Sequence, residues 1–288
     1  MARNSPGDNT RNIEMGIHNY IRDRVINWLI KDREVTDFPM CDFERIRYEL
    51  RPCDVLLTEG RNHVSDIIKY ATRSSWSHSA LYIGRIHDIA DPAIRAKAME
   101  HFNGSTDTQL LVEGLLDKGT VITPLSFYKQ DHIRICRPRS LSPDDAQHVI
   151  NFAINKLGSD YDVRQILDLA RFMLPWYFMP KKWRSSLFTS NPTQATRTVC
   201  STMIAEAFIS VNFPILPHIK KNKDTGIELF QRNPRLYTPR DFDYSPYFEI
   251  IKYPFVGLDD QPAYRKLPWN KDGVIISGNE RHTKEGSL

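Results

Sequence analysis

Residues 197–209 read RTVCSTMIAEAFI and predict a loop that leads into a helix. Apolar residues after the cysteine recur at helical spacing, and Cys200 completes their face one turn earlier. With Thr198 as the cap, the thiol falls in the first turn, where free N–H groups and the helix dipole favour a thiolate. The commoner role of such a cysteine is that of a small apolar core residue. The rest of the chain must decide between the two roles.

A histidine stands at the start of a second predicted element. Residues 74–86 read SSWSHSALYIGRI, a small polar turn that runs into an apolar strand, with His78 at the junction. A side chain there can reach a cleft while its backbone is held rigidly. Since histidines at strand edges are ordinary, this position alone gives only a candidate base.

Short strands and helices alternate through the rest of the chain. Glu113 stands at the end of one strand of a hairpin-like pair, and Cys136 reads as a strand residue that faces the core. We expect strands at 54–58, 109–113, 120–125 and 133–137, helices at 13–30, 64–72 and 142–157, and a charged excursion at 87–108. The amphipathic helix at 13–30 packs on its own domain, or it contacts a membrane surface or a partner.

Composition limits the class of protein. The 288 residues are 41% hydrophobic, which suits one large domain with insertions, and the formal charge of +4 is mild. The chain carries no nucleic-acid-binding pattern, so no nucleic acid partner is expected. Four cysteines without a CxxC pair indicate neither a zinc site nor a disulfide framework, which favours a reducing compartment. No secretory signal or membrane span is visible, so a cytoplasmic location is predicted.

The order of several short motifs resembles that of a known family. They are DVLL at 54–57, WSHSA at 76–80, VE at 112–113, VITPL at 121–125, YD at 161–162, CS at 200–201, AEAF at 205–208 and TPRDF at 238–242. This succession resembles the YiiX/YaeF-type permuted papain-like hydrolases, relatives of NlpC-type peptidases and of lecithin:retinol acyltransferase, over roughly residues 50–250. One departure is Cys53, where the family commonly has glycine.

The resemblance implies an α+β fold in which an antiparallel sheet packs against the helix that carries the nucleophile. It implies Cys200 as nucleophile, His78 as base and Glu113 as the carboxylate that orients His78. The residue types suit these roles, because acyl transfer by cysteine needs a thiolate, an imidazole and a third group that fixes the imidazole. Low-ranking candidates for substrate contact are Tyr82, Trp76 and Tyr161, and Tyr82 is also a weak candidate for an oxyanion contact because alternation puts it on the face of His78.

The expected organisation has three parts and one insertion. Residues 1–49 form a helical extension, 50–265 the permuted papain-like domain with an aromatic insertion at about 163–197, and 266–288 a frayed tail. Residues 166–184 are apolar and aromatic and end in a basic cluster, but they are too short and interrupted for a bilayer span. They are interpreted either as a cover or lid over the domain or as a peripheral membrane contact. Either role suggests a hydrophobic pocket.

The function predicted from the sequence is hydrolysis or acyl transfer at an amide, ester or thioester bond. The substrate is expected to be a peptide or a lipid-like acyl compound, and the mechanism needs no metal or organic cofactor. The alternative is a non-catalytic module that binds lipid or peptide in a papain-like cleft. Thiol reactivity discriminates between the two, because only the enzyme needs a depressed pKa at Cys200.

Overall fold

The computed structural model describes residues 41–115, 118–159, 199–222 and 226–254, the short ranges 273–277 and 280–283, and the single positions 24, 31, 256 and 267. The insertion at 163–197 and Tyr161 therefore lie outside the described residues, as does the predicted helix at 13–30 apart from position 24.

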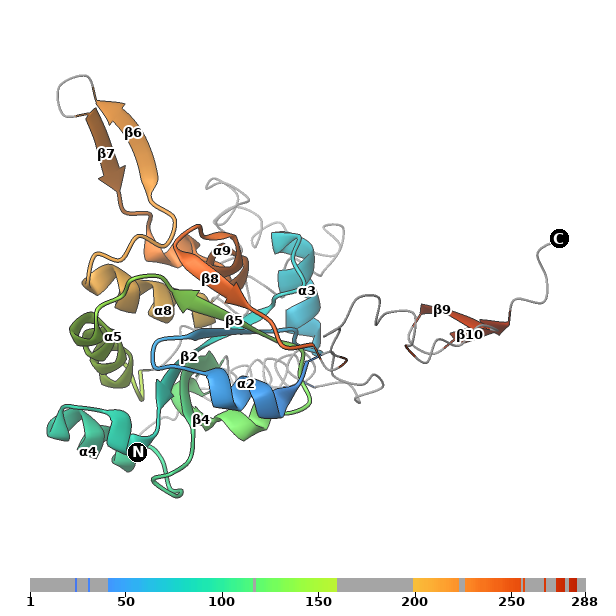
Figure 1. Cartoon of the computed structure of the whole chain (residues 1–288), viewed down its shortest axis with the longest axis horizontal. Coiled ribbons are helices and arrows are strands. Elements are labelled where there is room, and N and C mark those ends of the chain that lie inside the picture. Colours follow the sequence, from blue (N-terminus) through green and yellow to red (C-terminus); the bar gives the residue numbers. More distant parts are fainter. Residues whose placement is uncertain are drawn as a thin grey trace, which may run out of the picture.

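An antiparallel sheet forms the centre of the domain (Figure 1). Its strands run in the order β4-β3-β2-β1-β5-β8, and every neighbouring pair is antiparallel. They are β1 (Val55–Thr58), β2 (His78–Gly84), β3 (Leu110–Leu115), β4 (Gly119–Pro124), β5 (Ile133–Pro138) and β8 (Phe248–Ile251). The predicted hairpin-like pair is confirmed, since β3 and β4 pair along their whole length.

Helices surround this sheet, and two further pairs of strands lie outside it (Figure 1). The α-helices are α2 (Phe43–Glu49), α3 (His63–Thr72), α4 (Pro92–Glu100), α5 (Pro143–Asn155), α8 (Val199–Ser210) and α9 (Pro239–Tyr244). The 3-10 helices are η1 (Ile86–Asp88), η2 (Leu125–Tyr128) and η5 (Pro234–Leu236). The separate pairs are β6 (His218–Asn222) with β7 (Gly226–Phe230), and β9 (Gly273–Ser277) with β10 (Glu280–Thr283).

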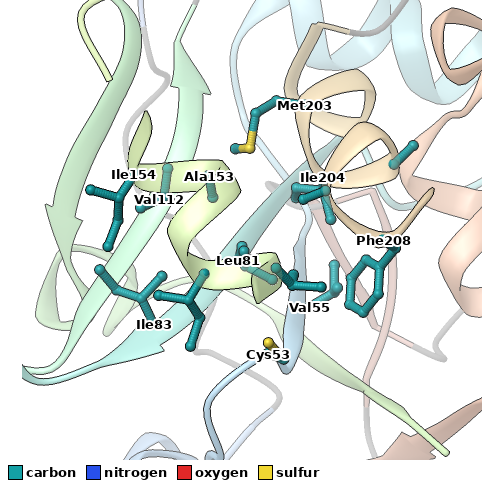
Figure 2. Close-up of a cluster of buried hydrophobic side chains, with 14 of the residues drawn as sticks. Cys53, Val55, Leu81, Ile83, Val112, Ala153, Ile154, Met203, Ile204 and Phe208 are labelled. Carbon is teal, nitrogen blue, oxygen red and sulfur yellow. The ribbon is translucent and has the colours of Figure 1, made fainter. Parts of the chain in front are cut away.

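Both faces of the sheet are buried, and alternate residues of each strand point to opposite faces. Val55 and Leu81 point to the face that α5 and α8 cover, where they join Ile204 and Phe208 in the main core (Figure 2). Leu56 points to the opposite face and packs with Ile46 of α2. The predicted α+β class, with an antiparallel sheet against the helix that carries Cys200, is confirmed.

The turn before β1 has a backbone conformation that favours glycine. Cys53 has a φ of +72°, a left-handed conformation that glycine adopts without strain, and its side chain is fully buried. The thiol donates to the carbonyl of Ala146 at 3.1 Å. Next to it, the buried Asp54 accepts two hydrogen bonds from Arg137, at 2.7 and 2.9 Å. The turn therefore keeps the shape that a glycine would favour while its side chain fills part of the core.

The segment that precedes β1 also packs on the sheet. Residues 41–49 lie against the sheet, with Ile46 in the core. Cys41 forms an isolated antiparallel β-bridge with Pro254. The N–H of Asp42 also donates to the carbonyl of Tyr253 at 2.8 Å. At the other end, part of the predicted tail forms the β9–β10 pair.

Candidate active site

Cys200 is the second residue of α8, as the sequence pattern predicts. Its side chain is buried, with 4% of the residue exposed. The hydroxyl of Ser201 donates to the carbonyl of Tyr237 at 2.6 Å and anchors the first turn. A residue in this turn has a backbone N–H without an intrahelical acceptor, next to the positive end of the helix dipole. The helix therefore presents a thiol and a free N–H together.

His78 is the first residue of β2, so its ring stands at the end of the sheet. Ala80, two residues later, pairs with Glu113 of β3, and alternation places His78 and Glu113 on the same face as diagonal neighbours. Nε2 of His78 lies 2.5 Å from Oε2 of Glu113. The sheet register thus joins the imidazole and the carboxylate.

Glu113 is completely buried and needs hydrogen-bond donors to remain ionised. Burial acts to raise its pKa, but His78, Thr123 and Tyr128 together hold the pKa below its ordinary value. The hydroxyl of Tyr128 donates to Oε2, the same oxygen that bonds to His78. Oε1 has no hydrogen-bond partner among the described residues. One carboxylate oxygen therefore carries both bonds.

Cys200 and His78 perturb one another strongly. Burial acts to raise the pKa of Cys200, but His78 and the N–H of Ser79 bring it below the ordinary 9.0. Burial likewise acts to lower the pKa of His78, yet the contacts with Cys200 and Glu113 raise it from 6.5 to about 10. The favoured state is a thiolate beside an imidazolium. Since Nε2 faces Glu113, Nδ1 is the nitrogen left for the sulfur.

Ser79 supports the sulfur from the strand. This serine is fully buried. The nearby thiol of Cys200 has its pKa lowered by both the backbone and the side chain of Ser79. The strand that supplies the base therefore also helps to stabilise the thiolate.

Sequence reasoning missed Tyr128. It ends η2, is 6% exposed, and stacks its ring on His78 with centroids 6.2 Å apart and planes 18° apart. Residues 125–128 read LSFY and resemble many aromatic turns that follow a strand. Only the fold brings this hydroxyl to Glu113, so the local sequence offers no signal for its role.

The structure describes two of the three residues predicted to contact substrate, Trp76 and Tyr82. Trp76 is 3% exposed in the main core, where its ring tilts against His132 and Arg134 lies over it. The hydroxyl of Tyr82 accepts from Gln109 at 2.8 Å, and four residues of strand separate it from His78 by about 13 Å. That separation argues against an oxyanion contact by Tyr82. Tyr161 lies outside the described residues, and substrate contact by Trp76 and Tyr82 stays a prediction.

The described residues also bear on metals and membranes. Within them, no three His, Cys, Asp or Glu side chains are grouped so as to hold a metal ion. In the same part of the chain, no helix combines the length and apolar character needed to cross a bilayer.

The comparisons with known proteins cover part of this site. A family model described as permuted papain-like amidase enzyme, YaeF/YiiX, C92 family, matches residues 49–171. This range includes His78 and Glu113 but ends before Cys200. No curated protein matches the chain. Among solved structures, the metalloprotein YiiX from Escherichia coli O157:H7 is similar at 14% identity and a TM-score of 0.41, over 70% of this chain and 97% of that one.

Proposed function

A family model of permuted papain-like amidases, YaeF/YiiX, matches residues 49–171, and from this premise we propose that the chain belongs to that family and cleaves an amide bond through Cys200, His78 and Glu113. The observation that supports this most directly is the 2.5 Å contact of His78 with Glu113 next to Cys200 in the first turn of α8, where the pKa of His78 is raised and that of Cys200 is lowered, which favours a thiolate beside an imidazolium. A core cysteine has no need of this charge state.

The first half of the proposed reaction acylates the enzyme. The Cys200 thiolate attacks the substrate carbonyl, and the C–O π electrons move to oxygen to form an oxyanion. The N–H of Cys200 at the helix start is the donor proposed for that oxyanion. As the tetrahedral intermediate collapses, the C–N bond breaks and imidazolium Nδ1 gives its proton to the leaving amine. The products of this half are the free amine and a thioester at Cys200.

The second half restores the enzyme. Neutral His78 takes a proton from water, and the resulting hydroxide attacks the thioester carbonyl. The C–S bond then breaks, the acid product leaves, and the thiolate–imidazolium pair is restored. Throughout, Glu113 remains ionised and holds Nε2–H, which fixes the ring with Nδ1 toward the sulfur. An amine or alcohol in place of water would make the same site an acyltransferase.

The substrate class is proposed from the chemistry of the bond. The family description supports an amide, and the same nucleophile is competent toward an ester or thioester. A lipid-like acyl group and a peripheral membrane contact remain proposals that depend on residues 166–184, which read ILDLARFMLPWYFMPKKWR. Co-sedimentation with anionic liposomes, before and after deletion of these residues, tests the contact. Unchanged binding after deletion would contradict it.

The pH dependence of alkylation by iodoacetamide tests the activated cysteine without a known substrate. We expect labelling of Cys200 to persist well below pH 9.0, because the pKa of this thiol is lowered. Cys200→Ser should abolish the signal. The matched control is Cys136→Ala, because Cys136 is a buried core thiol whose pKa is raised well above 9.0. This control should label like the unmodified protein.

Two outcomes lead in different directions. Rapid labelling at low pH justifies a screen of amides and acyl esters, with release of acid measured for the unmodified protein and for Cys200→Ser. Slow labelling that follows an ordinary thiol would contradict the catalytic proposal and favour a binding module with a papain-like cleft.

A further inference from the structure

The aromatic residue at the end of η2 is joined to two members of the site at once. The hydroxyl of Tyr128 donates to Oε2 of Glu113, and its ring lies nearly parallel to that of His78, with 6.2 Å between centroids. Tyr128 is 6% exposed, so it packs within the protein and does not face solvent. The residue therefore touches the groups that orient the base without being placed to touch a substrate.

The carboxylate depends on this contact more than a surface carboxylate would. Glu113 is fully buried, and Oε1 lacks a hydrogen-bond partner in the described part of the chain. Oε2 accepts from His78 and Tyr128, and the side chain of Thr123 also helps to hold the pKa of this carboxyl down. A buried ionised carboxylate that loses a donor is protonated more readily. A protonated Glu113 would no longer stabilise the imidazolium, and the thiolate would lose its counter-ion.

The hydroxyl of Tyr128 stays a hydrogen-bond donor over the whole pH range in which His78 titrates. Burial and the charge of Glu113 raise the pKa of Tyr128 well above 10.0, so its hydroxyl stays a donor while His78 titrates near 10. The stacked ring limits rotation of the imidazole, and the hydroxyl limits rotation of the carboxylate. These two contacts fix the line from Glu113 through His78 toward Cys200.

From this geometry we propose that Tyr128 is a positioning residue for the Cys200–His78 pair. Its hydroxyl keeps Glu113 ionised and oriented, and its ring braces His78. The inference rests on the proposed function, since it assigns a role within the same site. It adds a fourth residue whose contribution acts through Glu113 and His78.

Tyr128→Phe separates the hydroxyl from the ring. We expect it to keep the stacking but to raise the apparent pKa of Cys200 alkylation, with a loss of about tenfold in labelling rate at acidic pH for each unit of the rise. Tyr128→Leu removes both contacts and should lower the labelling rate at acidic pH further. Tyr48→Phe is the matched control, because it makes the same change at a tyrosine of α2 that is 90% exposed. Its pH profile should match that of the unmodified protein.

A second measurement keeps the test independent of folding defects. Proton NMR of the His78 Nε2–H resonance reports the bond to Glu113 directly, and Tyr128→Phe should shift it while Tyr48→Phe leaves it in place. If Tyr128→Phe is folded and changes neither the pH profile nor this resonance, the inference is wrong. If the unmodified protein itself shows no labelling below pH 9.0, the proposed function fails first. The two failures are therefore distinguishable.

Discussion

Strands β2 and β7 carry similar apolar residues in opposite surroundings. Leu81 of β2 is fully buried at the centre of a sheet that is covered on both faces, whereas Leu229 of β7 is 57% exposed. The β6–β7 pair forms its own two-stranded sheet that projects from the domain (Figure 1). Its register places Leu229 opposite Ile219, which is 59% exposed. The comparison shows that the burial of a side chain, and not its residue type, determines how strongly its replacement should affect the protein.

The same contrast applies to polar groups. On the hairpin, Lys220 lies over the ring of Phe230 with its charge in water. At the end of the central sheet, Glu113 and Ser79 are fully buried. Burial makes the hydrogen bonds of Glu113 to His78 and Tyr128 costly to lose. Changes at this end should therefore have large effects, and changes on the hairpin should have small ones.

The largest effect is expected from His78→Ala. Its removal takes away the charge that lowers the pKa of Cys200, and burial then acts to raise that pKa, opposed by the contacts of Ser79. Turnover should fall by about 10²–10⁴-fold, the usual contribution of a general acid–base residue. The check is kcat on any amide found by the screen, with circular dichroism to verify folding. A loss of less than tenfold would remove His78 as the base.

The next effect is on the titration of His78, followed by NMR. In the unmodified protein its pKa is about 10, raised from 6.5. A raised histidine pKa adds stability that is complete below pH 6.5 and is lost as the pH rises through about 10. Cys200→Ala removes the strongest cause of the rise, so the pKa should fall toward 6.5. An unchanged titration would show that the two side chains are not coupled.

A core leucine should matter less for chemistry but strongly for stability. Leu81→Ala removes a fully buried side chain from the main core. Such truncations cost about 2–5 kcal/mol, because they lose apolar contact and leave a cavity. Urea denaturation measures the loss. A cost under about 1 kcal/mol would mean that the core can collapse around the vacated space.

The matched change on the hairpin should be the smallest. Leu229→Ala alters a side chain that is 57% exposed, so the free energy of unfolding should change by no more than about 0.5 kcal/mol. The same denaturation series measures both leucines. A cost near that of Leu81→Ala would show that the hairpin is covered in solution.

Much of the central sheet is predictable from the sequence. The apolar runs in β1 and β2 reflect burial on both faces, and Ser142 with Pro143 begins α5 as expected, its side chain accepting from the N–H of Asp145 at 3.1 Å. Cys136 faces the core as predicted. These features are local, because strand and helix periodicity is written in neighbouring residues.

Other features depend on contacts that no local pattern records. The β6–β7 pair has apolar residues in exposed positions. The alternation of apolar and polar residues that predicts a half-buried strand therefore does not apply to it. The family resemblance names Cys200, His78 and Glu113, but their mutual pKa shifts require the folded geometry. Tyr128 is absent from the sequence-based site because only the fold brings its hydroxyl to Glu113.

The order of the site residues along the chain has a consequence for biosynthesis. His78 precedes Cys200 by 122 residues, and their meeting requires β2 to be covered by α8. Bringing together two residues so distant in sequence has a high entropic cost, so the contact forms only with the tertiary fold. A polypeptide that has not yet folded therefore has an ordinary thiol, and the reactivity of Cys200 depends on folding. Unfinished chains carry no active nucleophile.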